Sequence, residues 1–264
     1  MKEDISKIRA KNGFICDMDG VIYHGNKLLP GVKEFVEWLV KENKKFLFLT
    51  NSSERTPKEL QEKLIRMGIK VEQDKFYTSA LATAMFLSGQ KPKGSAYIIG
   101  EAGLINALYD VGYSMNNIDP DYVVMGEARS YGYEKIEKAV NLVLAGAKLI
   151  GTNPDISGPI EEGIAPATKA LIAPIEIASG KNAYFVGKPN PLMMRNALKI
   201  LGCEMEETII IGDRMDTDII AGIESEIDTC LVLSGISTKE TILQFPYQPT
   251  FILDGVHEIL SGEE

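Results

Sequence analysis

Six polar residues follow four short apolar runs, each near the point where a buried strand would end. The runs are Phe14–Cys16, Phe46–Leu49, Tyr184–Val186 and Ile209–Ile211. The polar residues that follow them are Asp17, Asp19, Thr50, Asn51, Lys188 and Asp213, and Asp216 and Asp218 lie just beyond the last run. In an open parallel sheet, ligands bind outside the carboxyl ends of the strands, so these side chains would surround one crevice. The sequence therefore predicts a crevice that holds several carboxylates together with a hydroxyl, an amide and an ammonium group.

The acids Asp17, Asp19 and Asp213 would repel one another strongly in such a crevice. Taken alone, an Asp after a strand is most often a turn or N-cap residue. Like charges ~4 Å apart in a low-dielectric site are costly, however, and here two strand ends supply three of them. A hard cation with oxygen ligands would turn that cost into binding, and Mg²⁺ typically takes a few carboxylates together with waters and substrate phosphate. We therefore expect Mg²⁺ as the cofactor.

The elements that must position these residues alternate almost from end to end of the chain. Short β-branched runs predict strands, and amphipathic stretches between them predict helices. The expected strands are 13–17, 45–50, 96–100, 122–126, 148–152, 183–187, 208–213 and 229–234. The expected helices are 31–42, 57–67, 103–111, 133–145, 191–201 and 216–225. This alternation is typical of an α/β fold with mostly parallel sheets, and Thr56-Pro57 reads as an N-cap followed by Pro at the first helical position.

The ordered set of motifs resembles the haloacid dehalogenase-type (HAD) phosphatases. Their first motif is matched by Asp17-Met18-Asp19-Gly20-Val21, their second by Thr50, their third by Lys188, and their fourth by Gly212-Asp213 with Asp218. The resemblance implies that Asp17 is the nucleophile, a known use of a carboxylate, and that Asp19 is the general acid and base. It further implies that Asp17, the backbone carbonyl of Asp19, and Asp213 bind Mg²⁺.

The same resemblance implies phosphate-binding and supporting roles for the remaining residues. Thr50, with Asn51, and Lys188 would bind the transferring phosphoryl group, and phosphoryl transfer needs mainly such positioning and charge stabilisation. Asp218 would support Lys188 or a metal-bound water, and Asp216 would cap the following helix.

The long interval between Thr50 and Lys188 predicts an inserted domain. Residues 82–179 contain their own strand–helix alternation, so we expect a Rossmann-like parallel-sheet core from residues 1–81 and 180–264 and an α/β cap from 82–179. The insertion resembles the C2-type cap of NagD-like and p-nitrophenylphosphatase-like members, a likeness that includes Leu49-Thr50-Asn51 and Gly187-Lys188-Pro189. Members of that group hydrolyse small phosphate monoesters such as nucleoside monophosphates, sugar phosphates and p-nitrophenyl phosphate.

Composition limits the classes of binding partner and the cellular compartment that we expect for this protein. The formal net charge is −9 without a basic stripe, which disfavours a nucleic-acid polymer as partner. No apolar run reaches the ~18–20 residues that a membrane span needs, and the polar first residues lack the apolar segment of a signal peptide. The three cysteines show no metal-ligand spacing and are typical of a reducing compartment. We expect a cytoplasmic protein that binds a small phosphorylated metabolite and no membrane; a homo-oligomer remains open.

Two other function classes use a similar set of residues. A phospho-accepting signalling module also places clustered Asp, Thr and Lys at strand ends, but it would be about half this length and would not need an acid two residues after the acceptor. A phosphotransferase would use the same aspartyl intermediate with an acceptor other than water. A non-catalytic binding protein with this fold would be expected to have lost an acid, whereas the motif set here is complete.

Overall fold

The computed structural model describes residues 5–160 and 162–261, which form two compact units. The first unit contains the described residues of Met1–Thr50, Gln61–Tyr77 and Lys188–Glu264, and the second contains Asn51–Leu60 and Thr78–Gly187. The cap domain expected from the sequence at 82–179 is narrower than this second unit, which also contains residues before and after that range. No helix among the described residues is both long enough and apolar enough to cross a membrane.

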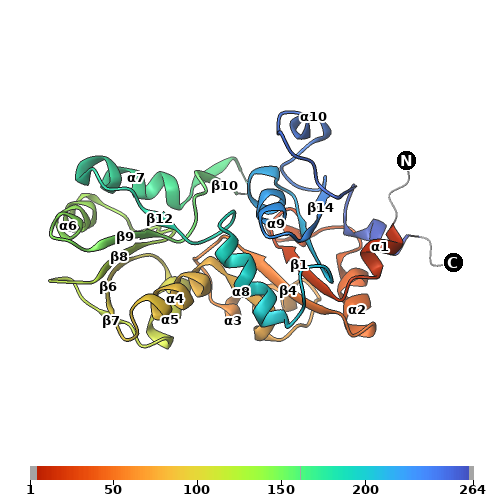
Figure 1. The fold of residues 1–264 in the computed structure, drawn as a ribbon, viewed down its shortest axis with the longest axis horizontal. Coiled ribbons are helices and arrows are strands. Elements are labelled where there is room, and N and C mark those ends of the chain that lie inside the picture. Colours follow the sequence, from red (N-terminus) through yellow and green to blue (C-terminus); the bar gives the residue numbers. More distant parts are fainter. Residues whose placement is uncertain (1–4, 161, 262–264) are drawn as a thin grey trace. The chain divides into compact units, whose positions relative to one another are not determined.

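The first unit is built on a six-stranded sheet. Its order is β15-β14-β13-β1-β4-β5, and β1 pairs in parallel with both β13 and β4, as β14 does with β13 and β15. The strands are β1 (Gly13–Asp17), β4 (Lys45–Thr50), β5 (Phe76–Thr78), β13 (Thr208–Gly212), β14 (Asp228–Val232) and β15 (Phe251–Leu253). Figure 1 shows the red and orange strands β1 and β4 and the blue strand β14 in one sheet, so segments from both ends of the chain meet there. The parallel α/β core predicted from the sequence is confirmed.

Helices surround the first sheet. They are α1 (Ile5–Arg9), α2 (Val32–Lys41), α3 (Pro57–Arg66), α8 (Pro191–Leu201), α9 (Ile220–Glu224) and α10 (Lys239–Ile242), with short helical turns η1 (Gln73–Lys75), η2 (Met215–Ile219) and η3 (Val256–Leu260). α3 itself passes from the second unit into the first. An aromatic cluster joins β1 to α2, since the Phe14 ring lies edge-on to both Phe35 and Trp38. A two-stranded hairpin of β2 (Tyr23–His24) and β3 (Lys27–Leu28) follows β1.

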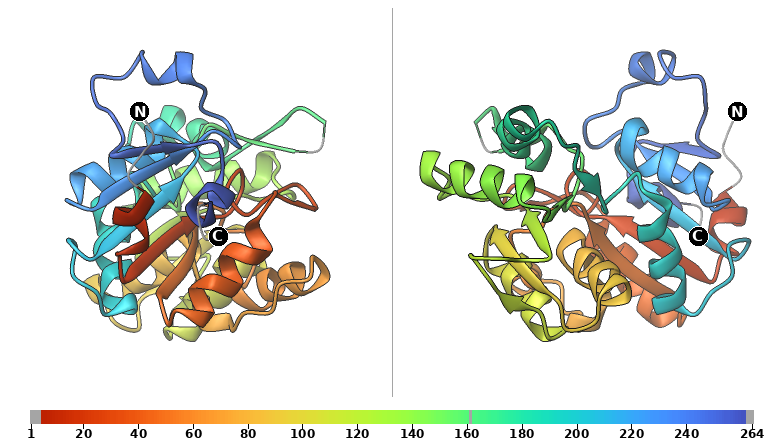
Figure 2. Two further views of the ribbon diagram at one scale, coloured as in Figure 1. Left: turned by 90° about the vertical axis from the view of Figure 1, so that its right-hand side faces the viewer. Right: turned by 60° about the vertical axis from the view of Figure 1, so that its left-hand side comes forward.

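The second unit has its own parallel sheet of five strands, in the order β12-β9-β8-β6-β7. These are β6 (Ser95–Ile99), β7 (Ser114–Met115), β8 (Tyr122–Met125), β9 (Lys148–Gly151) and β12 (Tyr184–Phe185), and β10 (Ser157–Pro159) and β11 (Ile164–Pro166) form a separate antiparallel hairpin. Helices α4 (Ser79–Gln90) and α5 (Ala102–Asp110) lie on one side of the sheet, and α6 (Tyr133–Leu144) and α7 (Thr168–Ser179) lie on the other (Figures 1 and 2).

Two expectations about individual elements are corrected. The run before Lys188 was expected to be a strand of the core sheet, but β12 is a two-residue edge strand that pairs with β9 of the second unit. Phe185 packs on the apolar cluster of that unit, which explains why this segment joins it. The helix expected at 216–225 begins instead as the π-helical turn η2, in which the N–H of Ile219 donates to the carbonyl of Arg214 five residues before it.

Candidate active site

The carboxyl ends of β1 and β13 bring the predicted acids together in the first unit. β1 ends at Asp17, and Asp213 follows the last residue of β13, to which β1 is paired in parallel. Among the described residues, Asp17, Asp213 and Asp218 form a group whose ligand oxygens all lie within 4.8 Å of one another. The close approach of Asp17 and Asp213 inferred from the strand ends is therefore present in the structure, and the third carboxylate of the group is that of Asp218 and not that of Asp19.

Lys188 lies between two of these acids. Its Nζ is 2.5 Å from Oδ1 of Asp17 and 2.5 Å from Oδ1 of Asp218, and only 2% of the residue is exposed. Burial disfavours the ammonium form, but the two carboxylates outweigh that effect and raise the pKa of Lys188 above its ordinary value. Lys188 is therefore a fixed positive charge beside the Asp17 carboxylate. Asp218 also accepts from the backbone N–H of Arg214 at 3.1 Å, which fixes the orientation of its carboxylate.

Burial shapes the electrostatics of the other acids. Burial raises the pKa of Asp17 well above its ordinary value, Lys188 opposes that shift, and Asp218 and Asp213 add to it. Burial and the Asp218 carboxylate likewise raise the pKa of Asp213 to about 7. Asp213 accepts a hydrogen bond of 2.8 Å from the N–H of Ile236. Asp17, Asp213 and Asp218 supply three carboxylates, and the Lys188 ammonium is the one positive charge paired with them. The group therefore leaves negative charge to be offset, and a divalent cation with oxygen ligands fits that requirement.

The glycine of the first motif is required by the space around Asp213. Gly20 has φ of 79°, in the left-handed region, and a Cβ there would collide with the Asp213 carboxylate and lie 3.0 Å from Cα of Gly235. A side chain at position 20 would therefore displace a candidate metal ligand as well as strain the backbone.

The remaining predicted residues fall at different places. Asp19 is exposed and its backbone forms a bridge with Tyr23, so it lies at the start of the turn that leads into the β2–β3 hairpin. Thr50 is the buried last residue of β4, one position beyond the Leu49 that pairs with Asp17. Asn51 belongs to the second unit, where its side-chain amide donates to Oδ2 of Asp155 at 3.0 Å. Asp216, which was expected to cap the following helix, pairs with the Arg214 guanidinium.

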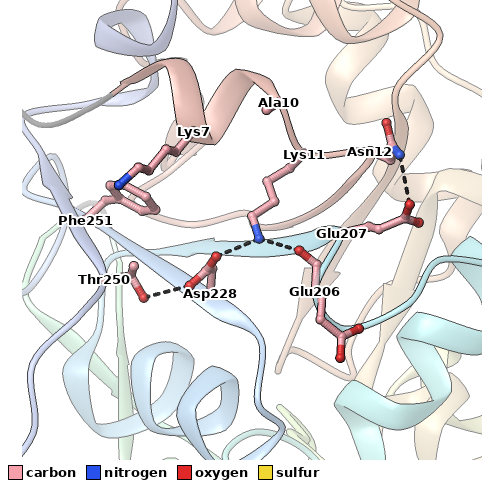
Figure 3. A pocket seen from close by; sticks show the side chains of 9 residues that line it. All are labelled: Lys7, Ala10, Lys11, Asn12, Glu206, Glu207, Asp228, Thr250 and Phe251. Carbon is pink, nitrogen blue, oxygen red and sulfur yellow. Dashed lines mark hydrogen bonds and ion pairs between the residues drawn. The ribbon is translucent and has the colours of Figure 1, made fainter.

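A hollow also lies at the amino ends of the strands of the first sheet. Figure 3 shows it lined by residues before β1, β13 and β15 and at the start of β14, among them Lys11, Glu206 and Asp228. The Lys11 Nζ lies 2.6 Å from Oδ2 of Asp228 and donates to the carbonyl of Glu206 at 2.5 Å. These groups satisfy one another, and they lie at the amino ends of parallel strands, away from the edge where such sheets bind ligands. We assign this hollow a structural role.

Comparison with known proteins agrees with this geometry. Residues 14–114 match the family model described as haloacid dehalogenase-like hydrolase, and residues 185–259 match a second, HAD-hydrolase-like model. The chain is 43% identical to a dihydroxyacetone phosphatase of Corynebacterium glutamicum, over 93% of this chain and 90% of that protein.

Two further relatives extend the likeness. The ribonucleotide monophosphatase NagD of Escherichia coli is 42% identical, over 93% of this chain and 96% of its own length. The crystal structure of 4-nitrophenylphosphatase from Thermotoga maritima has a TM-score of 0.93 at 32% identity and covers 98% of this chain and 99% of its own. The resemblance inferred from the motifs is confirmed: the chain belongs to the haloacid dehalogenase-like hydrolases, as a NagD-like hydrolase of phosphoric monoesters.

Proposed function

We propose that this chain hydrolyses small phosphate monoesters with Mg²⁺ as cofactor, through a covalent phosphoryl intermediate on Asp17. The observation that carries this proposal is the Asp17 carboxylate at the end of β1, paired with the buried Lys188 ammonium and grouped with two further acids. The relatives described above are named for different substrates that share the phosphate ester, which supports nucleoside monophosphates, sugar phosphates and p-nitrophenyl phosphate as the substrate class.

The first half-reaction transfers the phosphoryl group to the protein. An Asp17 oxygen attacks phosphorus while the bond from phosphorus to the ester oxygen breaks, and Asp19 donates a proton to that leaving oxygen. Lys188 lies where it can stabilise the negative charge of the phosphoryl oxygens, because its ammonium already contacts the attacking carboxylate. Thr50, at the end of the neighbouring strand, would donate its hydroxyl to the same group.

The second half-reaction releases phosphate. Asp19, now deprotonated, accepts a proton from water as the water oxygen attacks phosphorus, and the bond between Asp17 and phosphorus breaks. Asp17 returns to its carboxylate form and Asp19 to its acid form, so the cycle closes. Asp17, Asp213 and the Asp19 carbonyl would hold Mg²⁺, which supplies positive charge to the phosphoryl oxygens when bound.

The second unit is proposed to serve as the cap over this chemistry, with the leaving group as its ligand. A cap excludes bulk water and completes the site, which is its general use in enzymes. The same Asp17 chemistry with an alcohol in place of water would make the chain a phosphotransferase, and the ratio of free phosphate to transferred phosphate distinguishes the two.

Asp17→Asn tests the proposed function directly. An amide cannot act as the nucleophile, so we expect turnover of p-nitrophenyl phosphate to fall by at least about 10³-fold. Acid quenching of the wild-type reaction should yield a phosphorylated peptide that contains Asp17, and the variant should yield none. Asp228→Asn is the matched control: it makes the same change at an acid at the amino end of β14. This variant should keep wild-type turnover. Near-normal turnover of the Asp17 variant contradicts the nucleophile assignment.

A further inference from the structure

A polar network inside the second unit holds the chain where it leaves and re-enters that unit. The chain enters the second unit at Asn51, directly after Thr50, and leaves it at Gly187, directly before Lys188. Both residues on the first-unit side of these crossings belong to the proposed site. Whatever fixes Asn51 and Gly187 therefore also limits where Thr50 and Lys188 can lie.

Glu127 lies at the centre of this network, two residues beyond the end of β8. Its Oε2 accepts from the backbone N–H of Ser53 at 3.0 Å and from the Ser53 hydroxyl, and its Oε1 accepts from Nδ2 of Asn153 at 2.7 Å. Its own N–H donates back to the Ser53 hydroxyl at 3.2 Å. Burial raises the pKa of Glu127, and these hydrogen bonds oppose the shift. Each of these contacts uses the carboxylate only as an acceptor, so an amide cannot replace it without facing one donor with another.

Asn153 links Glu127 to Asn51 through hydrogen bonds. Its Nδ2 also donates to the carbonyl of Asn51 at 2.7 Å, and the Ser79 hydroxyl donates to the same carbonyl at 2.5 Å. The Asn51 side chain is fixed in turn by Asp155. The segment from Asn51 to Ser53 is therefore bound to the ends of β8 and β9 by both backbone and side-chain groups.

The outgoing crossing packs against the incoming one. The N–H of Gly187 donates to the carbonyl of Thr152 at 2.7 Å. A Cβ at position 187 would lie 2.7 Å from both Oδ1 of Asn51 and the carbonyl oxygen of Thr152, so only glycine allows the backbone this close. The two crossings are thus held side by side by one set of contacts.

We propose that Glu127 is a positioning residue: through Ser53 and Asn153 it fixes the two crossings and thereby the placement of Thr50 and Lys188 for phosphoryl transfer. This inference rests on the proposed function. Phosphoryl transfer depends on placement more than on covalent help from the protein, and small displacements of positioning groups are expensive in rate. A buried network that is fully satisfied also favours one arrangement over its alternatives.

Glu127→Gln, which keeps the volume of the side chain, tests the proposal. We expect kcat for p-nitrophenyl phosphate, per folded molecule, to fall about 10- to 100-fold while KM changes less than about threefold, because placement of the transferring group matters most in the transition state. The folded fraction is measured by thermal unfolding monitored by circular dichroism, and the kinetics are run well below the midpoint of each protein.

Asp121→Asn is the matched control within the second unit. Asp121 precedes β8 as Glu127 follows it, and its Oδ2 also accepts from the N–H of a serine, Ser95, at 2.8 Å and from its hydroxyl at 3.1 Å. It should lose stability as Glu127→Gln does but keep kcat within about twofold of the wild type, since it touches neither crossing.

Three outcomes decide the proposal. A folded Glu127→Gln protein with wild-type kcat overturns it, as does an equal loss of kcat in Asp121→Asn. If Glu127→Gln does not fold, Ser53→Ala removes one hydroxyl of the same network, and an unchanged kcat in that variant overturns the proposal. A wild-type chain without phosphatase activity contradicts the proposed function itself, which is a different result from an active wild type with an unaffected variant.

Discussion

At the scale of single residues, Lys188 is a group that the proposed chemistry needs but that adds little to the stability of the fold. A buried ammonium between two carboxylates is held by Coulomb attraction but has lost its hydration, so such a group contributes little net stability compared with an apolar replacement. Its removal alone, however, leaves the two acids buried without a countercharge. A second substitution that removes one of these acids should therefore restore part of the stability lost with Lys188, but not the activity.

The variant Lys188→Met separates these two effects. We expect it to lower the free energy of unfolding by about 3–5 kcal/mol, the usual cost of breaking a buried ion pair, and to abolish turnover. Adding Asp218→Asn should recover part of the stability, because one unpaired charge is removed, without recovering activity. Urea unfolding in the presence of chelator and p-nitrophenyl phosphate turnover measure the two quantities; recovery of turnover in the double variant would contradict the role given to Lys188.

Residue types and order were enough to predict that Asp17 and Asp213 meet, but not that Asp218 completes the acidic group. Asp17 and Asp213 follow strands with clear apolar patterns, so their meeting follows from parallel pairing alone. Lys188 reaches Asp17 without any core strand before it, which no local pattern shows. The contacts of Glu127 with Ser53 and Asn153 join residues distant in sequence, and their only local sign is a polar residue at the end of a strand.

At the scale of elements, the strongest patterns predicted the structure best. β1 and β4 have the predicted bounds, because a buried strand bounded by polar residues is unambiguous. The Ala-rich helix α4 was not predicted, since it is apolar on most sides and lacks a helical period. The short strands β5, β12 and β15 were missed or misplaced because their pairing with distant partners, not their own two or three residues, makes them strands.

The start of α3 is one boundary that the sequence did predict, and its capping can be tested. Thr56 donates its N–H to Oε2 of Glu59 at 2.8 Å, and the N–H of Glu59 donates to the Thr56 hydroxyl at 3.2 Å. These form a capping box that satisfies two backbone donors at the helix start. Thr56→Ala should therefore cost about 1 kcal/mol of unfolding free energy, whereas Thr56→Ser should cost little.

The same capping box makes this loss depend on pH. The hydrogen bonds from Thr56 hold the pKa of Glu59 below its ordinary value. A carboxyl whose pKa is depressed by folding adds stability above its ordinary pKa, and that stability is lost as pH falls through the folded-state value. The difference between wild type and Thr56→Ala in denaturant unfolding should therefore shrink below about pH 4. A difference that grows as pH falls would contradict the capping assignment.

At the scale of the whole molecule, one site joins segments from opposite ends of the sequence. Asp17 lies in β1 and Asp213 directly after β13, and these strands are neighbours in the first sheet. A cation held by both carboxylates would tie the two strands together at their carboxyl ends and remove the repulsion between buried acids. Because such a site does not exist in the unfolded chain, the binding free energy of the ion adds to the stability of the fold.

Mg²⁺ should therefore stabilise the protein as well as activate it. Binding at 100 times the dissociation constant adds about 2.7 kcal/mol, which raises the unfolding temperature by several degrees in a protein of this size. We expect excess chelator to stop turnover of p-nitrophenyl phosphate and to lower the unfolding temperature, and added Mg²⁺ to reverse both. Asp213→Asn should abolish the thermal response to Mg²⁺, while Asp228→Asn, outside the acidic group, should keep it. An equal response in both variants would place the ion elsewhere, and full activity in chelator would contradict the metal-dependent mechanism.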